Sequence, residues 1–228
     1  MDADNKAYLK VIRYIRQQLV SGLLGIGNKL PAERELSERL GLSRNSIREA
    51  LRTMDNMGLV SSRQGSGNYL TGNIEKSFSE SLSMMVLAKQ VDYIEMSQLR
   101  RAIELQSLLL AMGRITEGEL AHIEGILLKM EGSRKIDEPA LDKEFHYAIV
   151  AASGNELMIN IMQALSTACE QMIDFVLRQS ADGSRNLLLE SHRRIYESLL
   201  HKDQSLGVAS VAAHYDIVDN GLKTAQKM

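Results

Sequence analysis

Apolar residues recur along most of this chain at the three- and four-residue spacing of one helical face. After residue 77 this spacing runs almost without interruption, and Pro139 is the only proline that follows Pro31. The predicted helices span about residues 78–88, 92–113, 117–131, 138–152, 155–180, 184–201 and 204–225. Because their connections are short, we expect an all-α antiparallel helical bundle in this part of the chain.

Helix-start signals support several of these boundaries. Thr116 and Glu119 have the spacing of a capping box, in which each side chain bonds a backbone N–H group of the other residue. Asp137 and Asn155 are residue types that suit an N-cap. New helices are therefore expected to begin just after these positions.

A different order of elements is predicted within residues 29–70. A helix, a tight turn at Gly41 and a second helix are followed there by a glycine-rich hairpin. The inward stripe of the second helix consists of Ile47, Leu51 and Met54, which face Leu36 and Leu40. The outward stripe is largely cationic and consists of Arg44, Asn45, Arg48 and Arg52. This order predicts a winged helix-turn-helix, which is a DNA-binding fold.

The arginine at the start of the second helix favours DNA binding. Ser43 is the expected N-cap, so Arg44 falls in the first turn, where a positive charge opposes the helix dipole by about 0.3–1 kcal/mol. In helix-turn-helix proteins this end of the helix enters the major groove, where Arg pairs with guanine and Asn with adenine. The alternative is an ordinary solvated, arginine-rich helix face.

The predicted hairpin supplies a second feature typical of DNA binding. Its expected strands span residues 59–62 and 68–70. Gly65 and Gly67 provide the positive φ angles that a hairpin tip requires, and such a tip can approach a phosphate closely. Donors beside the tip are Arg63 and Gln64. The alternative is a hairpin that only stabilises the domain.

Charge is divided unevenly along the chain. The formal net charge of −2 by itself predicts no nucleic-acid partner. Residues 1–72, however, carry eleven Lys and Arg against seven Asp and Glu, or +4, while residues 73–228 carry sixteen against twenty-two, or −6. The basic part coincides with the predicted DNA-binding part, so phosphate contacts should make its binding strongly salt-dependent.

Length and composition argue against a membrane or secreted protein. The 228 residues exceed the common size of one domain, and 44% of them are hydrophobic, which suffices for a sizeable core. No apolar run approaches the roughly 20 residues that span a bilayer, and the N-terminus lacks the apolar stretch of a signal peptide, so we expect a cytoplasmic protein. The single cysteine, Cys169, excludes an intrachain disulfide and is expected in a buried apolar position.

Four polar residues stand out on apolar helices in the second part of the chain. Asp142 and His146 are spaced i, i+4, which places both on one helical face, and His192 and His214 lie in the last two helices. Three imidazoles and a carboxylate from three helices can hold a divalent transition metal and leave coordination positions open. Spacing alone leaves a second interpretation open, in which each histidine is an ordinary, hydrogen-bonded core residue.

Residues 8–70 closely resemble the N-terminal domain of the GntR family of bacterial transcription regulators, on the segments LPAERELS, SRNSIREAL and RQGSG. The resemblance implies that the wing reaches the minor groove beside the helix. The predicted DNA-binding residues are Arg34, Arg44, Asn45, Arg48, Gln64, Gly65 and Gly67. The resemblance also implies a first helix over residues 8–22, with Val11, Ile12, Ile15 and Leu19 inward and Arg13 and Arg16 outward.

Residues 92–222 resemble the FCD ligand-sensing domain of the FadR-like subfamily, on QLRRAIE, DKEFHYAIVAASGNELM, SHRRIYESL and the histidine of the final helix. Many members with this pattern bind a metal on which a small organic acid docks. The resemblance implies that the metal ligands are Asp142, His146, His192 and His214. It implies a divalent transition metal, with zinc expected and nickel or manganese as alternatives.

The resemblance also assigns a role to one arginine. Arg100 corresponds to the family arginine that points into the effector pocket, where a guanidinium can clamp a carboxylate with two hydrogen bonds. Arg101 is then its solvated neighbour. The alternative for Arg100 is a surface ion pair with Glu104 at i+4. His122 and His201 have no partners in the pattern and are expected on the surface.

These features predict three segments: a winged helix-turn-helix DNA-binding domain at 1–72, a linker and connecting helix at 73–91, and an all-helical effector and metal-binding FCD domain at 92–228. The predicted protein is a homodimer that reads a palindromic DNA operator and responds to a small carboxylate effector. Release of DNA on effector binding is the more frequent behaviour in the family and is typical of a repressor, while the sequence leaves open whether the effector releases DNA or strengthens binding.

Two other functions stay open at this point. A metal with open positions also serves hydrolases, but the sequence has no HExxH arrangement. The one candidate general base is Glu144, whose position near Asp142 turns it away from the ligand face. A DNA-binding architectural protein without an effector is the third interpretation. The predicted class is therefore a regulator that is not an enzyme.

Overall fold

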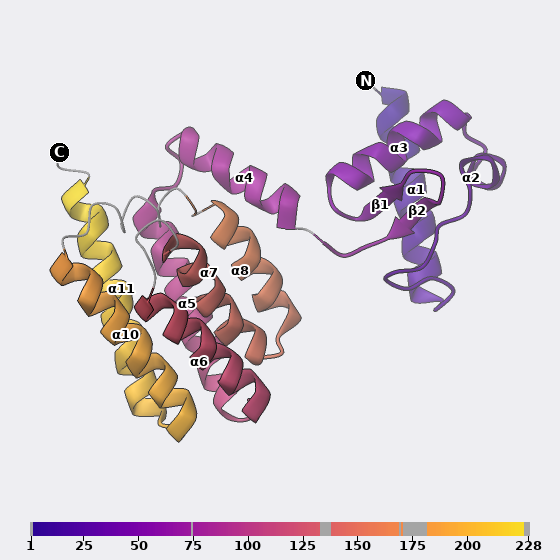
Figure 1. The fold of residues 1–228 in the computed structure, drawn as a ribbon. Helices are drawn as coiled ribbons and strands as arrows, with labels where there is room; N and C mark the ends of the chain where they lie inside the picture. Colours follow the sequence, from indigo (N-terminus) through magenta and orange to yellow (C-terminus); the bar gives the residue numbers. More distant parts are fainter. Residues whose placement is uncertain (1, 74, 133–137, 169, 171–181, 226–228) are drawn as a thin grey trace. The chain divides into compact units, whose positions relative to one another are not determined.

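The computed structural model describes residues 2–73, 75–132, 138–168, 170 and 182–225 (Figure 1). The chain divides into two compact units, Met1–Phe78 and Ser79–Met228. Helices make up most of both units, which confirms the predicted mainly α fold. Within the described residues, every helix is too short or too polar to cross a membrane.

The first unit has the predicted order of a winged helix-turn-helix. Its elements are α1 (Asp2–Val20), α2 (Glu33–Leu40), α3 (Arg44–Asn56), β1 (Val60–Arg63) and β2 (Gly67–Leu70). The two strands are antiparallel and form the wing, with Val60 opposite Leu70 and Arg63 opposite Gly67. Lys29 adds an isolated bridge to Tyr69, which ties the chain before α2 to the wing.

Local sequence explains the turn between α2 and α3. Gly41 ends α2 in the left-handed conformation, at φ 62°, and its N–H group bonds the Ser37 carbonyl oxygen. Ser43 caps α3, because its hydroxyl oxygen accepts a hydrogen bond from the Ser46 N–H group at 3.0 Å. The predicted turn and the predicted N-cap are both confirmed.

One core joins the elements of the first unit, and its buried members are Val11, Ile15, Leu30, Leu36, Ile47, Ala50, Leu51, Met54, Val60 and Leu70. The prediction that Leu19 faces inward is wrong, since this residue is 41% exposed. The buried stripe of α1 ends at Ile15, one turn earlier. Leu24, which follows the helix, packs against the core instead.

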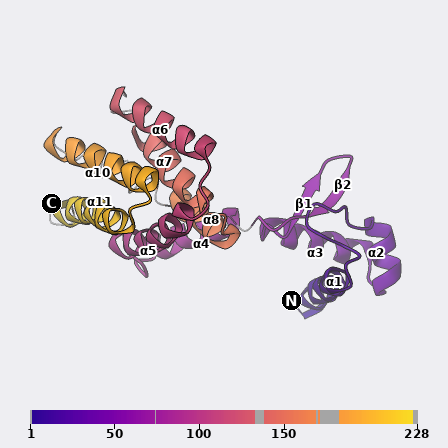
Figure 2. The same ribbon diagram turned by 90° about the horizontal axis from the view of Figure 1, so that it is seen from below.

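The second unit is helical throughout its described part. Its helices are α4 (Glu75–Leu87, which begins in the first unit), α5 (Tyr93–Met112), α6 (Glu117–Gly132), α7 (Glu138–Ala152), α8 (Glu156–Ala168), α10 (Asp182–His201) and α11 (Gln204–Ala225). In the order α5, α7, α6, α10 and α11, each helix packs against the next and the last packs against the first. Figure 2 views this group from below, with α8 against α7. The ring of helices encloses a core that includes Leu108, Phe145, Ile149, Ile195 and Val211.

The predicted helix boundaries agree with these elements where the structure describes them. The capping box at Thr116 and Glu119 is present, and the Asn155 side chain accepts a hydrogen bond from the Met158 N–H group at 3.2 Å. A second box, between Asp92 and Glu95, was not predicted. The helix predicted at 155–180 is described as α8 up to residue 168. The predicted cap at residue 137 and the predicted burial of residue 169 fall outside the described residues.

Candidate metal centre and nucleic-acid interface

Four potential metal ligands come together inside the helical ring. Asp142 and His146 come from α7, His192 from α10 and His214 from α11, and one donor atom of each lies within 4.8 Å of the donors of the others. All four side chains are buried. The helix packing therefore gathers residues that are up to 72 positions apart in the sequence.

The donor atoms of the cluster point toward one another. His192 Nε2 lies 3.2 Å from His146 Nε2 and 3.3 Å from Asp142 Oδ1, and His146 Nε2 lies 3.5 Å from the same carboxylate oxygen. Two imidazole nitrogens and one carboxylate oxygen thus share a small volume. This arrangement suits one metal cation that all three atoms would coordinate.

Hydrogen bonds on the far side of two imidazoles leave their ligand nitrogens available. His146 Nδ1 lies 2.7 Å from Glu104 Oε1, and a carboxylate can only accept there. His214 Nδ1 lies 3.1 Å from the hydroxyl oxygen of Ser191, whose own proton goes to the Leu188 carbonyl. Both rings therefore carry a proton on Nδ1, and Nε2 is the nitrogen that faces the cluster.

Burial and neighbouring charges set the ionisation of the cluster. Burial is the largest influence on the Asp142 carboxyl and raises its pKa, but His146 and His192 together bring that pKa well below its ordinary value. Burial lowers the pKa of His146, while the attraction of Glu104 and Asp142 outweighs it and raises that pKa to about 9. Burial lowers the pKa of His192 as well, and the pKa of His214 falls well below its ordinary value through burial and repulsion by the other two imidazoles.

Glu104 is a site residue that the sequence interpretation missed. It is fully buried on α5, with Oε1 on His146 and Oε2 accepting a hydrogen bond from the Tyr215 hydroxyl at 2.7 Å. Burial raises the pKa of this carboxyl, but His146, Tyr215 and Arg100 together bring it below its ordinary value. The alternative of a surface ion pair between Arg100 and Glu104 is wrong, because both residues are buried. Their shared helical face in QLRRAIELQ was the available signal.

Arg100 lies inside the helical unit, at 3% exposure, and its charge lowers the pKa of both Glu104 and His214. Arg101 lies at the surface instead and pairs with Asp216 at 2.8 Å. His122 and His201 are exposed, as predicted.

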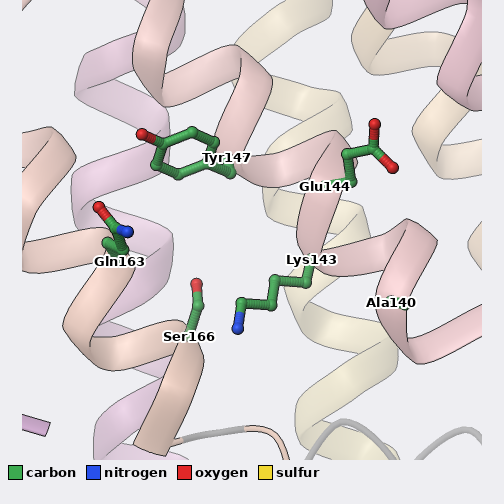
Figure 3. A pocket seen from close by; sticks show the side chains of 6 residues that line it. All are labelled: Ala140, Lys143, Glu144, Tyr147, Gln163 and Ser166. Carbon is green, nitrogen blue, oxygen red and sulfur yellow. The ribbon is translucent and has the colours of Figure 1, made fainter. Parts of the chain in front are cut away.

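A separate pocket of about 280 Å³ lies between α7 and α8 (Figure 3). Its lining residues are Ala140, Lys143, Glu144, Tyr147, Gln163 and Ser166. It contains none of the predicted metal or effector residues. Helix α7 thus contributes Asp142 and His146 to the His and Asp cluster on one side and lines this pocket on another.

The predicted DNA-binding residues of α2 and α3 are exposed and positively charged or polar. Arg44 and Asn45 open α3, whose first turn has no acidic residue. Arg34 pairs with Glu38 at 3.0 Å, and Arg48 pairs with Glu33 at 3.0 Å. The Glu33 pair was not predicted, since it joins residues on different helices.

The wing tip has the predicted glycine conformations. Gly65 has φ 72° and Gly67 has φ 110°. A Cβ atom at Gly67 would lie only 2.9 Å from Lys29 Cε, so a side chain there would also force that lysine to move. Gln64 is exposed beside the tip. The Arg63 guanidinium instead lies over the Tyr69 ring, 4.3 Å from its centroid.

A basic helix-turn-helix with a wing, joined to a helical domain with a buried His and Asp cluster, defines a DNA-binding transcription regulator. The chain belongs to the GntR family: residues 7–70 match the model of the bacterial regulatory proteins of the gntR family, and residues 95–216 match the FCD domain. Both predicted resemblances are thereby confirmed. The matched families and the similar proteins below are regulators and not enzymes.

Individual proteins agree with this assignment. The chain is 31% identical to the HTH-type transcriptional regulator LutR of Bacillus subtilis over 208 residues, which cover 89% of this chain and 94% of that protein. It is 29% identical over 218 residues to the putative L-lactate dehydrogenase operon regulatory protein of Escherichia coli, covering 88% and 80%. The solved structure titled Streptococcus agalactiae GntR has the same fold, at a TM-score of 0.66 and 24% identity, over 94% of this chain and 99% of that chain.

Proposed function

We propose that this regulator binds a divalent transition metal in its helical domain and senses a small carboxylate on that metal. The observation that carries the proposal is the convergence of four buried donor atoms within 4.8 Å. A cluster of three imidazoles and a carboxylate with no ligand would leave several polar groups buried against one another. A bound cation would give each of them a partner.

The donor set fits a transition metal. Asp142, His146, His192 and His214 offer three nitrogens and one oxygen, a combination that suits zinc, nickel or manganese better than calcium or magnesium. The lowered pKa of Asp142, His192 and His214 favours their metal-binding protonation states. The raised pKa of His146 means that metal binding would displace a proton from its Nε2. A bound ion would supply an electrophilic anchor for an oxygen atom of a carboxylate or hydroxy acid.

Arg100 is the proposed partner of the effector carboxylate. Its guanidinium is buried on α5 and acts electrostatically on His214. A guanidinium can bind both oxygens of a carboxylate, which would select acids over alcohols or amides of the same size. The E. coli relative named for the L-lactate dehydrogenase operon makes L-lactate the first acid to test.

Residues 1–72 are the part of the chain that would bind the DNA operator. Arg34, Arg44, Asn45 and Arg48 would contact the major groove and its phosphates, and the wing residues Gln64, Gly65 and Gly67 would reach the adjacent minor groove. Because one such domain reads a half-site, the proposed complex is a homodimer on a palindrome. Segment 73–91 would link this domain to the effector domain at 92–228.

Effector control requires a coupling energy between the two units. Allosteric couplings are typically about 1–3 kcal/mol, which corresponds to about 5- to 150-fold in operator affinity. The proposed effector would supply this energy by favouring one packing of the ring helices. In the family, release of DNA is the more frequent result, so repression relieved by an acid is the proposed direction.

A thermal-shift screen with metal-stripped and zinc-reloaded protein tests the sensing half. Zinc at 100 times its Kd should stabilise the protein by about 2.7 kcal/mol. L-Lactate, glycolate or citrate should raise Tm further only in zinc-loaded protein, whereas the neutral amide of the active acid should not. Arg100→Ala should abolish the acid response and retain the zinc response. Its matched control is Arg101→Ala, which should respond as the wild type does.

Three results would contradict the proposal. If zinc did not raise the Tm of the stripped protein, the proposed metal centre would be wrong. An acid response of equal size in stripped protein would place the effector away from the metal. Operator binding that no acid changes would favour the effector-independent DNA-binding protein.

A further inference from the structure

Glu104 lies next to the four proposed metal ligands, on the side of His146 that faces away from the other three. It is 0% exposed in the middle of α5, so its charge lies away from bulk solvent. Burying a carboxylate is costly unless hydrogen bonds and opposite charges compensate. Each of its two oxygens has a hydrogen-bond partner, and the two partners come from different helices.

The two partners hold the carboxylate in one orientation. Oε1 lies 2.7 Å from His146 Nδ1 on α7, and Oε2 accepts the Tyr215 hydroxyl proton on α11, also at 2.7 Å. Tyr215 is itself 2% exposed, so no solvent competes for this bond. Glu104 thus connects α5, α7 and α11, which are neighbours in the helical ring.

The contact decides which nitrogen of His146 is available to an ion. An ionised carboxylate accepts hydrogen bonds but cannot donate them, so His146 must carry a proton on Nδ1. Its other nitrogen, Nε2, faces His192 and Asp142 and is the one that a bound ion would take as its ligand. A carboxylate behind a ligating imidazole also fixes the ring orientation and makes the nitrogen a stronger donor.

We propose that Glu104 is a positioning residue of the metal centre, acting through His146, and that Tyr215 anchors Glu104 for this purpose. This inference rests on the metal site of the proposed function and extends it to residues outside the ligand set. The competing explanation is that Glu104 only neutralises the buried Arg100. That explanation predicts an effect on stability without a specific effect on His146.

Zinc affinity, measured by competition with a chelator, separates the two explanations. Glu104→Gln keeps the size of the side chain but puts an amide where two acceptor oxygens are needed, so zinc affinity should fall by about 10- to 100-fold. Tyr215→Phe removes only the anchor and should produce a smaller loss. Ser107→Ala is the matched control: it is buried on the same helix, and its hydroxyl contacts Met158 Sδ at 3.5 Å instead of the cluster. Its zinc affinity should equal that of the wild type.

A spectroscopic readout reports on His146 directly. In zinc-loaded wild-type protein, the Nδ1 proton of His146 should give a downfield imidazole N–H resonance that exchanges slowly with water, because Glu104 holds it in the core. Glu104→Gln should shift this resonance upfield and speed its exchange. A role limited to charge balance would leave the resonance in place.

Unchanged zinc affinity in folded Glu104→Gln, together with a retained resonance, would overturn the inference and leave the metal centre intact. Wild-type protein without zinc affinity would overturn the metal centre and this inference together. If Glu104→Gln does not fold, Tyr215→Phe decides: an altered His146 resonance and weaker zinc binding support the positioning role, and wild-type values for both contradict it.

Discussion

The two units hold their charged side chains under opposite conditions. In the helical unit, Glu104, Asp142 and His146 are buried, and His146 contacts both carboxylates, which restricts their orientation. In the winged helix, Arg34 and Arg48 are exposed and pair with acidic neighbours on the surface. Such exposed pairs add little stability, so phosphates can replace the acidic partners readily. Burial therefore separates a site suited to one small ion from a surface suited to a long polyanion.

The largest expected effect comes from removing one of the four proposed metal ligands. His192→Ala should weaken zinc binding by more than about 100-fold, because loss of even an outer partner weakens metal sites by 10- to 100-fold. Chelator competition measures this change. His201→Ala is the matched control, since it removes an exposed imidazole from the same helix and should leave zinc affinity unchanged. Equal affinities in the two variants would place the metal elsewhere.

Arg44→Ala should have the next largest effect, on operator binding. Loss of a guanidinium that reads a base costs about 1–3 kcal/mol, or about 5- to 150-fold, and relaxes the preference at one base pair. Fluorescence anisotropy measures the loss of affinity on an operator selected from random DNA. The same measurement on single-base variants of that operator gives the change in base preference. Arg101→Ala makes the same change of charge in the helical unit and should bind as the wild type does. A uniform loss across all base variants would assign Arg44 to phosphate contact instead.

Arg48→Ala tests whether an exposed charge in the winged helix serves DNA binding and not the stability of the fold. Because its partner Glu33 is also near the surface, the variant should keep a Tm close to that of the wild type. The slope of log affinity against log salt concentration should decrease by about 1, as expected when one phosphate contact is lost. A large fall in Tm with an unchanged salt slope would show that this arginine is structural.

The smallest expected effect is a loss of stability on substitution of Glu119, in the exposed first turn of α6. Hydrogen bonds from the Thr116 backbone and hydroxyl lower the pKa of the Glu119 carboxyl below its ordinary value. A carboxyl with a lowered pKa stabilises the fold above its unfolded-state pKa, and this stabilisation is lost as pH falls through the folded-state pKa.

Glu119→Gln should therefore lower stability at pH 7 by about 0.3–1 kcal/mol, and the difference from wild type should vanish once the pH falls below the lowered folded-state pKa of the Glu119 carboxyl. Urea denaturation over this range measures the difference. Glu190→Gln, which is exposed within α10, should change stability less. A difference that persists at low pH would exclude the charge as its cause.

Local patterns predicted most of the fold because they act over a few residues. The turn at Gly41, the cap at Ser43 and the capping box at Thr116 depend only on nearby backbone, and the structure has all three. Leu19 was placed wrongly because helical phase shows which side of α1 is apolar but not where the core beneath it ends.

The cluster itself was accessible from the sequence mainly through its resemblance to FCD domains, since spacing links only Asp142 with His146. Glu104 was missed because its partners, His146 and Tyr215, lie 42 and 111 positions away. No local rule distinguishes a buried Arg and Glu at i, i+4 from an exposed pair with the same spacing. The packing of α5 against α7 and α11 makes that distinction.

The central claim is that the buried cluster controls the exposed DNA-binding face, and operator affinity measured in an effector titration tests it most directly. Zinc-loaded wild-type protein should lose operator affinity by about 5- to 150-fold as the active acid is added. Metal-stripped protein and the His192→Ala variant should show no such change. Identical titration curves for loaded and stripped protein would contradict the account.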